Sequence, residues 1–100
     1  MIDDTYPTDK ELGYIGTYDP LKHDNSFLLL AKFVTSIWWY PESSEIRGKR
    51  WTCSTCGWSG NEDIIAALKK NYIFWSLCFK SERAGGHFEF ELVEIKKSRN

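Results

Sequence analysis

The fold is decided by residues 59–92, which read SGNEDIIAALKKNYIFWSLCFKSERAGGHFEFEL. The first part of this stretch predicts a helix over residues 60–71. Ser59, followed by Glu62 three residues later, matches the capping box of a helix N-terminus, and the two lysines at residues 69–70 suit a helix C-terminus. The apolar face of the predicted helix consists of Ile64, Ile65, Leu68 and Tyr72.

The second part of the stretch changes to the alternating pattern of a β-strand. The apolar side of the first predicted strand consists of Ile73, Trp75, Leu77 and Phe79. A second strand over residues 87–92 follows a tight turn at residues 84–86, where glycine supplies positive φ angles. The favoured register places Phe79 opposite Phe90 and pairs unlike charges. The other predicted pairs are Leu77–Leu92, Lys80–Glu89 and Glu82–His87. We therefore expect an α+β fold in which a C-terminal antiparallel β-hairpin packs on one or two helices.

The N-terminal half carries weaker signals. Residues 27–40 form an apolar run whose first half favours a helix and whose second half, rich in β-branched and aromatic residues, favours an extended chain. A polar loop is predicted over residues 41–48. Residues 1–25 are predicted to form an acidic, mostly irregular arm, with a short strand as an option at residues 14–18. The remaining residues, 26–100, are predicted to form a single α+β domain.

The composition favours binding to a protein over binding to nucleic acid. Sixteen of the 100 residues are aromatic, enough to build a core without disulfides. Tryptophan and tyrosine are also enriched at binding hot spots, so we expect some of them at the surface. Residues 1–25 carry six acidic and two basic side chains, and the pI of about 6.1 argues against broad nucleic-acid binding. An acidic segment can instead dock on a basic protein through complementary charge.

The N-terminus, the longest apolar run and the cysteines predict a cytoplasmic protein. The acidic N-terminus lacks the basic and apolar regions of a secretory signal, and the apolar run at residues 27–40 is shorter than the roughly 20 residues that span a membrane. The three cysteines cannot all pair within the chain, which is typical of a reduced protein. We expect a monomer or a homodimer and no membrane partner.

The segment Trp51–Gly60, which reads WTCSTCGWSG, carries the most specific chemistry. Its Cys-x-x-Cys-Gly turn brings Cys53 and Cys56 to one point, as half of a tetrahedral zinc site does. The segment resembles one knuckle of a zinc ribbon, although the second Cys-x-x-Cys of those proteins is missing. Because such ribbons bring a hairpin end against the knuckle, His87 is the predicted third ligand of one structural zinc. Two alternatives stay open, namely reduced cysteines in a tight turn and a redox pair.

The sequence favours a binding protein over an enzyme. It contains no Gly-rich phosphate loop, no His-Glu-x-x-His pattern and no Gly-x-Ser-x-Gly elbow. The favoured hypothesis is a non-enzymatic protein-binding module, an inhibitor, immunity or antagonist-type protein that binds a larger protein target. One alternative is a zinc-knuckle nucleic-acid-binding protein that uses Arg47, Lys49, Arg50 and Trp51 for phosphate contacts and base stacking. The other is a small thiol oxidoreductase. The residues predicted to contact a partner are Trp38, Trp39, Tyr40, Arg47, Arg50, Trp51 and Trp58.

Overall fold

The computed structural model describes residues 6–95. Within them the helices are α1 (Asp9–Thr17), α2 (Leu28–Ile37), α3 (Ser59–Lys70) and α4 (Tyr72–Cys78), with two short 3-10 helices, η1 (Pro20–Lys22) and η2 (Pro41–Ser43). The strands are β1 (Ser44–Arg47), β2 (Arg50–Ser54), β3 (Phe79–Arg83) and β4 (His87–Glu91). This architecture confirms the predicted α+β class. No helix in the described range has the length and apolar character that crossing a membrane requires.

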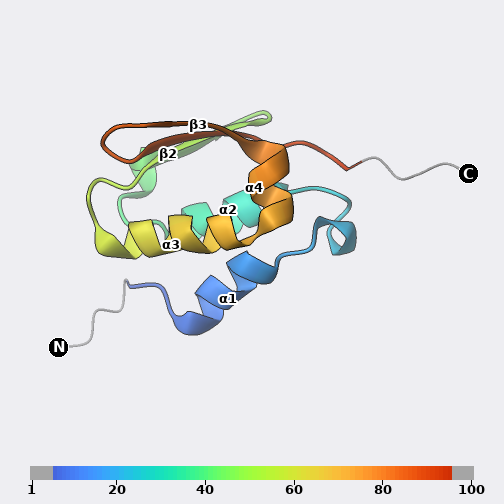
Figure 1. The fold of residues 1–100 in the computed structure, drawn as a ribbon, viewed down its shortest axis with the longest axis horizontal. Coiled ribbons are helices and arrows are strands. Elements are labelled where there is room, and N and C mark those ends of the chain that lie inside the picture. The colour runs from blue at the N-terminus through green and yellow to red at the C-terminus, as the bar shows by residue number, and fades with distance from the viewer. Residues whose placement is uncertain (1–5, 96–100) are drawn as a thin grey trace, which may run out of the picture.

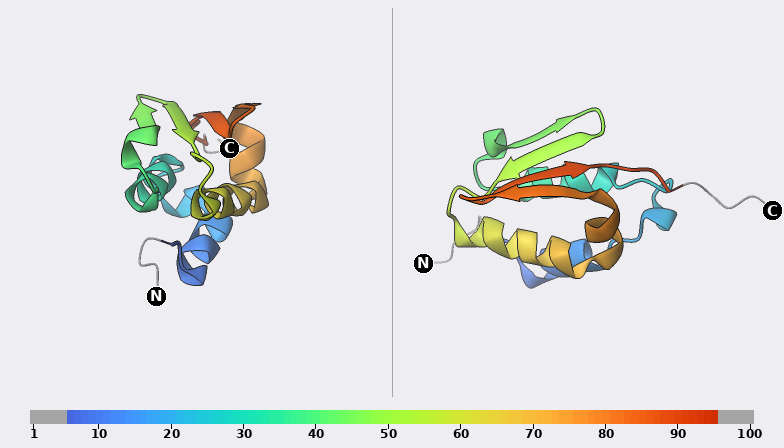
Figure 2. Two further views of the ribbon diagram at one scale, coloured as in Figure 1. Left: turned by 90° about the vertical axis from the view of Figure 1, so that its left-hand side faces the viewer. Right: turned by 45° about the horizontal axis from the view of Figure 1, so that its top comes forward.

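The strands form one antiparallel sheet in the order β1-β2-β4-β3. Helices α2, α3 and α4 cover one face of the sheet, and α1 packs on the side of α3 that points away from it (Figure 1). No helix of the described chain covers the other face, as the end-on view in Figure 2 shows. Burial follows this layering, because the buried residues of β2 and β4 alternate with exposed or half-buried ones.

The core between the sheet and the helices is built on aromatic rings. Trp51 of β2 is 0% exposed, and its ring centroid lies 5.0 Å from that of Phe90 in β4 and 6.0 Å from that of Phe74 in α4. The indole N–H donates to the hydroxyl of Ser44 at 3.0 Å, which satisfies the one polar atom of a buried ring. Trp51 is therefore a core residue and out of reach of a partner, contrary to its predicted role.

The N-terminal segment contains a helix where the sequence predicts an irregular arm. The hydroxyl of Thr8 accepts from the N–H of Glu11 at 3.1 Å, and the carboxylate of Glu11 accepts from the N–H of Thr8 at 2.9 Å. This reciprocal pair is a capping box and starts α1. The prediction of an irregular chain, with an optional strand at residues 14–18, is wrong for residues 9–17 because this cap outweighs the glycines in the segment.

The apolar run at residues 27–40 is helical as far as Ile37. Its second half is not extended as predicted, because buried residues such as Leu30 and Val34 recur at helical spacing and pack as one face. The prediction of a polar loop over residues 41–48 is also wrong, since Pro41–Ser43 forms η2 and Ser44–Arg47 forms the edge strand β1.

Helix α3 confirms the helix predicted over residues 60–71, to within one residue at each end. The predicted apolar face is buried at Ile64, Ile65 and Leu68. The predicted capping box does not form. Ser59 is already the first helical residue, and the N-cap position falls on Trp58, which makes no capping hydrogen bond through its side chain.

Helix α4 occupies residues that the sequence assigns to a strand. The side-chain oxygen of Asn71 accepts from the N–H of Phe74 at 3.1 Å and so caps the new helix. Its amide nitrogen donates to the carbonyls of Ile15 and Tyr18 at 3.0 and 3.1 Å, which ties the start of α4 to the end of α1. The helix buries Phe74 and Cys78, which are four residues apart. Neither side chain belongs to the apolar side of the strand predicted here, which consists of Ile73, Trp75, Leu77 and Phe79.

The C-terminal hairpin is confirmed, with a different register beyond its first pair. Phe79 pairs with Phe90 as predicted, but an irregularity then shifts β3 against β4. The pairs beyond it are Ser81–Glu89, Glu82–Phe88 and Arg83–His87. The three other predicted pairs are wrong, because a bulge adds one residue to one strand and because Leu77 belongs to α4.

Candidate functional site

Four aromatic side chains form a continuous surface row where α2 ends and α3 begins. Ring centroids lie 5.4 Å apart for Tyr40 and Trp39, 5.3 Å for Trp39 and Trp58, and 5.5 Å for Trp58 and Tyr6. These spacings are those of attractive aromatic pairs. The two tyrosines are exposed and the two tryptophans are half-buried. We call these four residues the aromatic row.

The two adjacent tryptophans after α2 face opposite ways. Trp38 is buried, and its indole N–H donates to the hydroxyl of Ser43 and to the carbonyl of Ser54, both at 3.0 Å. Because the backbone is extended at Trp38 (ψ 132°), the next side chain turns outward. Trp38 is therefore packed mostly into the core, although it still borders the groove described below, and Trp39 is available for contacts.

Asn61 fixes the backbone of Trp39 to α3. This side chain is 0% exposed. Its oxygen accepts from the N–H of Trp39 at 3.0 Å, and its amide nitrogen donates to the carbonyls of Trp39 and Thr55 at 3.0 and 3.2 Å. The carboxamide thus engages its oxygen and both of its N–H donors. The backbone of Trp39 is therefore ordered within the fold by two of these hydrogen bonds.

Tyr40 adopts a left-handed backbone conformation, with φ 66° and ψ 71°. A residue with a Cβ costs roughly 1–2 kcal/mol in this region, and such strain is concentrated at binding and catalytic sites. The carbonyl of Tyr40 accepts from the N–H and the hydroxyl of Ser43 at 2.8 and 2.7 Å. Since the ring is 46% exposed, this conformation does not serve to bury it.

An open groove of about 510 Å³ runs beside the row, and we call it the aromatic groove. Three members of the row line it, together with Glu11 and Glu42. No lysine, arginine or histidine of residues 6–95 is among its lining residues. At its edge the hydroxyl of Tyr6 donates to the carboxylate of Asp63, a hydrogen bond that raises the pKa of Tyr6. The groove therefore combines aromatic surface with negative charge.

The Cys-x-x-Cys-Gly motif forms the tight turn between β2 and α3. The N–H of Trp58 donates to the carbonyl of Thr55 at 3.0 Å. The two residues between them have positive φ angles, 55° at Cys56 and 72° at Gly57, as in a type I′ turn. The chain's three cysteines are free thiols. Of the alternatives raised by the motif, this geometry favours reduced cysteines in a tight turn.

The predicted zinc ligands are not brought together. Cys53 is 4% exposed and faces the core, whereas His87 is exposed on the other face, with its Nδ1 2.7 Å from the hydroxyl of Ser54. Burial raises the pKa of Cys53 to about 12, which disfavours the thiolate that zinc and redox chemistry both require. Among the described residues, no group of three or more His, Cys, Asp or Glu side chains could hold a metal ion. The set of Cys53, Cys56 and His87 therefore has no geometric support.

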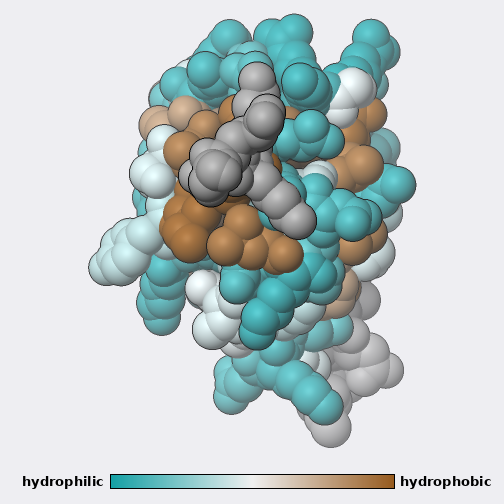
Figure 3. Space-filling model, turned by 90° about the vertical axis from the view of Figure 1, so that its right-hand side faces the viewer, coloured by the Kyte–Doolittle hydropathy of each residue, from teal (hydrophilic) through white to brown (hydrophobic). Residues whose placement is uncertain are grey.

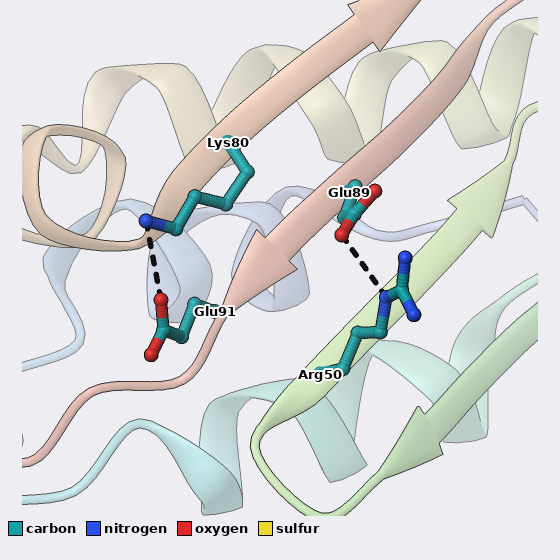
Figure 4. Close-up of polar contacts among 4 residues, drawn as sticks. All are labelled: Arg50, Lys80, Glu89 and Glu91. Atoms are coloured by element: carbon teal, nitrogen blue, oxygen red, sulfur yellow. Dashed lines mark hydrogen bonds and ion pairs between the residues drawn. The ribbon is translucent and has the colours of Figure 1, made fainter.

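The uncovered face of the sheet holds the predicted arginines in ion pairs. Arg50 of β2 pairs with Glu89 of β4 at 3.0 Å, and Lys80 of β3 pairs with Glu91 of β4 at 3.1 Å (Figure 4). Arg47 pairs at 2.7 Å with a glutamate of its own strand. Exposed pairs of this kind stabilise a fold by only about 0–1 kcal/mol, but they neutralise much of the basic charge that a partner would meet here.

A second apolar surface lies at the other end of the molecule, around α4. Figure 3 shows hydrophobic side chains gathered on this end. Exposed apolar residues of α4 and η1 include Leu21, Tyr72, Ile73 and Leu77. The surface gives no indication of the chemistry of an occupant, so we do not assign it a role.

The structure brings three predicted contact residues, Trp39, Tyr40 and Trp58, into one site. Sequence reasoning misses Tyr6 and Asn61, which complete it. The Thr-x-x-Glu cap of α1 is the signal that could have indicated an ordered N-terminal segment near Tyr6, whereas no local pattern marks Asn61. No protein-family model, curated protein or solved structure matches this chain.

Proposed function

We propose that this chain is a non-enzymatic protein-binding module, of the inhibitor, immunity or antagonist type, that holds a larger protein partner at the aromatic groove. The observation that carries the proposal is the aromatic row, in which Asn61 clamps Trp39 and Tyr40 keeps a strained backbone. Tryptophan and tyrosine dominate binding hot spots because they bury a large surface on contact.

The order already present in the row supports tight association. Binding loses about 0.5–1.5 kcal/mol for each flexible side chain that a contact immobilises. The rings of Trp39 and Trp58 already pack on each other in the free chain, so less freedom is lost when a partner arrives. The adjacent groove of about 510 Å³ offers a concave seat for a protruding side chain.

Charge favours a protein partner over a nucleic acid. Nucleic-acid affinity depends on neutralising phosphates with lysine and arginine, whereas the groove presents the carboxylates of Glu11 and Glu42. Arg50, a predicted phosphate contact, is already paired with Glu89. Trp51, the predicted base-stacking residue, is buried in the core.

The test compares one groove variant with one variant at the opposite end of the molecule. Tyr40→Gly removes the ring and suits the left-handed backbone, so we expect the free energy of unfolding to change by less than about 1 kcal/mol. Tyr72→Ala is the control, because Tyr72 is 82% exposed on α4. The partner is captured from cells that produce the chain, purified, and titrated with each variant by calorimetry.

We expect Tyr40→Gly to weaken binding of the captured protein by at least about tenfold, as loss of a hot-spot ring does. Tyr72→Ala should leave the dissociation constant within about twofold of the original, as most residues outside a hot spot do. Unchanged binding by Tyr40→Gly, or an equal loss in both variants, would show that the groove is not the contact surface.

A further inference from the structure

The chemistry of the aromatic groove identifies the class of side chain that it binds. We infer that the groove receives an arginine or lysine side chain of the protein partner, held by the carboxylates of Glu11 and Glu42 and by the faces of the aromatic row. This inference rests on the proposed function and names the ligand group of the same site.

The two carboxylates are available to such a ligand. Glu42 lies in η2 and is exposed, and none of the three ion pairs of the described chain involves it. Glu11 uses Oε1 to accept from the N–H of Thr8 at 2.9 Å, and among the described residues its Oε2 takes part in no hydrogen bond or ion pair. With no cationic lining residue in the described chain to compete, the groove carries negative charge that an incoming cation can neutralise.

The rings add a second attraction for a cation. An ammonium or guanidinium within about 6 Å of a ring centroid is attracted by the ring's electron-rich face, most strongly for tryptophan. The molecule already makes one such contact elsewhere, because Nζ of Lys69 lies 5.6 Å from the centroid of Trp75. Trp39 offers a half-buried indole beside the groove, and no lysine within residues 6–95 lies over its ring.

Geometry favours arginine over lysine. A guanidinium is planar, so it can stack on an indole and still donate to carboxylates through its edge. An ammonium has a more tightly held hydration shell, which it must lose on entry. A groove of about 510 Å³ accommodates one such side chain with part of its flanking peptide.

The probe is a short blocked peptide with one central arginine, compared with peptides that carry lysine or citrulline at the same place. Citrulline has nearly the shape of arginine but no charge, so shape and charge are separated. Binding is followed through the indole N–H signals of the 15N-labelled full chain. We expect saturable binding of the arginine peptide near millimolar concentration, about three- to tenfold tighter than that of the citrulline peptide.

Two Glu→Gln substitutions, each of which removes one negative charge, test whether the charge in the groove holds the peptide. Glu42→Gln should weaken the arginine peptide about two- to fivefold, as removal of one exposed charge partner does. Glu45→Gln, on the uncovered face of the sheet and paired with Arg47, should leave binding unchanged. Added salt should weaken the arginine peptide more than the citrulline peptide.

Equal binding of arginine and citrulline peptides, or no saturable response to either basic peptide up to about 10 mM, would overturn the inference. In that case a loss of partner binding by Tyr40→Gly would still support the proposed function. Conversely, suppose that the groove binds the arginine peptide in preference to the citrulline peptide while Tyr40→Gly still binds the partner fully. The groove would then be a site for a cationic side chain but not the surface that holds the partner.

Discussion

Asn61→Ala removes the clamp that orders Trp39, and its effect can be worked out from three hydrogen bonds. The substitution leaves the N–H and carbonyl of Trp39 and the carbonyl of Thr55 without their carboxamide partner. The Thr55 carbonyl contact is buried, whereas the two Trp39 contacts are only partly so. Water can therefore replace the lost partner at Trp39 more easily than at Thr55.

A buried polar group left without a partner costs about 1–3 kcal/mol. One such group, together with two that are partly rehydrated, gives a total of about 2–3 kcal/mol, since the higher helix propensity of alanine offsets only a few tenths. For a domain of this size, that loss lowers the melting temperature by about 10–20 °C. Because small domains have about 5–15 kcal/mol of stability, we expect the variant to remain folded at room temperature.

The assay is urea unfolding followed by far-UV circular dichroism, which does not depend on the environment of Trp39. Asn71→Ala is the matched control, because Asn71 is also buried and also makes three hydrogen bonds through its carboxamide, to α1 and α4. Asn71→Ala should lose at least as much stability as Asn61→Ala, because all three of its hydrogen bonds are buried, but only Asn61→Ala should weaken arginine-peptide binding at the groove. A loss below about 0.5 kcal/mol in Asn61→Ala, or equal weakening of peptide binding by both variants, would refute the reasoning.

Three further perturbations test the structure. A methyl group added at Gly60 would collide with the ring of Trp58, whereas at Gly13 it would meet nothing within 4 Å. Urea unfolding should therefore show that Gly60→Ala lowers the free energy of unfolding by about 1–3 kcal/mol and that Gly13→Ala raises it by about 0.5–1 kcal/mol. Equal effects of the two substitutions would contradict the close packing at Gly60. Iodoacetamide should label the exposed Cys56 in the native protein and should react with Cys53 only after unfolding. The labelled sites are identified by peptide mass spectrometry after digestion, and fast labelling of Cys53 in the native protein would contradict its burial. The pKa of Cys53 rises on folding from 9.0 to about 12, so the unfolded state releases this proton first. The free energy of unfolding measured in urea should therefore fall as pH rises from 9, and Cys53 contributes up to about 1.4 kcal/mol per pH unit to this fall. If the stability of a Cys53→Ala variant falls equally steeply with pH, Cys53 is excluded as the cause.

Local patterns predict an element when its buried face and its secondary-structure period agree. Helix α3 satisfies this condition, because Ile64, Ile65 and Leu68 are both helically spaced and buried. Residues 73–79 violate it, since their apolar side chains alternate as in a strand although the chain forms α4. The decisive interaction is the cap from Asn71, together with the hydrogen bonds from that side chain to the end of α1. Such a contact joins segments more than fifty residues apart in the sequence, so the pattern within one segment does not contain it.

The candidate site shows the same division between local and long-range information. The abundance of tryptophan and tyrosine indicates from the sequence that some rings lie at the surface. Which of the two neighbours Trp38 and Trp39 is exposed depends on where α2 ends and on hydrogen bonds to Ser43 and Ser54. The role of the cysteine motif likewise depends on the layering of the sheet, because adjacent residues of β2 and β4 face opposite sides. The sequence predicts the residue types of the site, and the tertiary fold selects among them.

The residue at position 40 is the strongest physical argument that the site exists for binding. A left-handed turn that leads into Pro41 is formed most easily by glycine, which adopts positive φ angles without the cost of a Cβ. Tyr40 instead retains a strain of roughly 1–2 kcal/mol, and its half-exposed ring adds little to the core. Stability of the fold therefore does not account for a tyrosine at this position. The proposed contact between its ring and a partner would account for it, and this is why Tyr40→Gly should separate the stability of the domain from its binding.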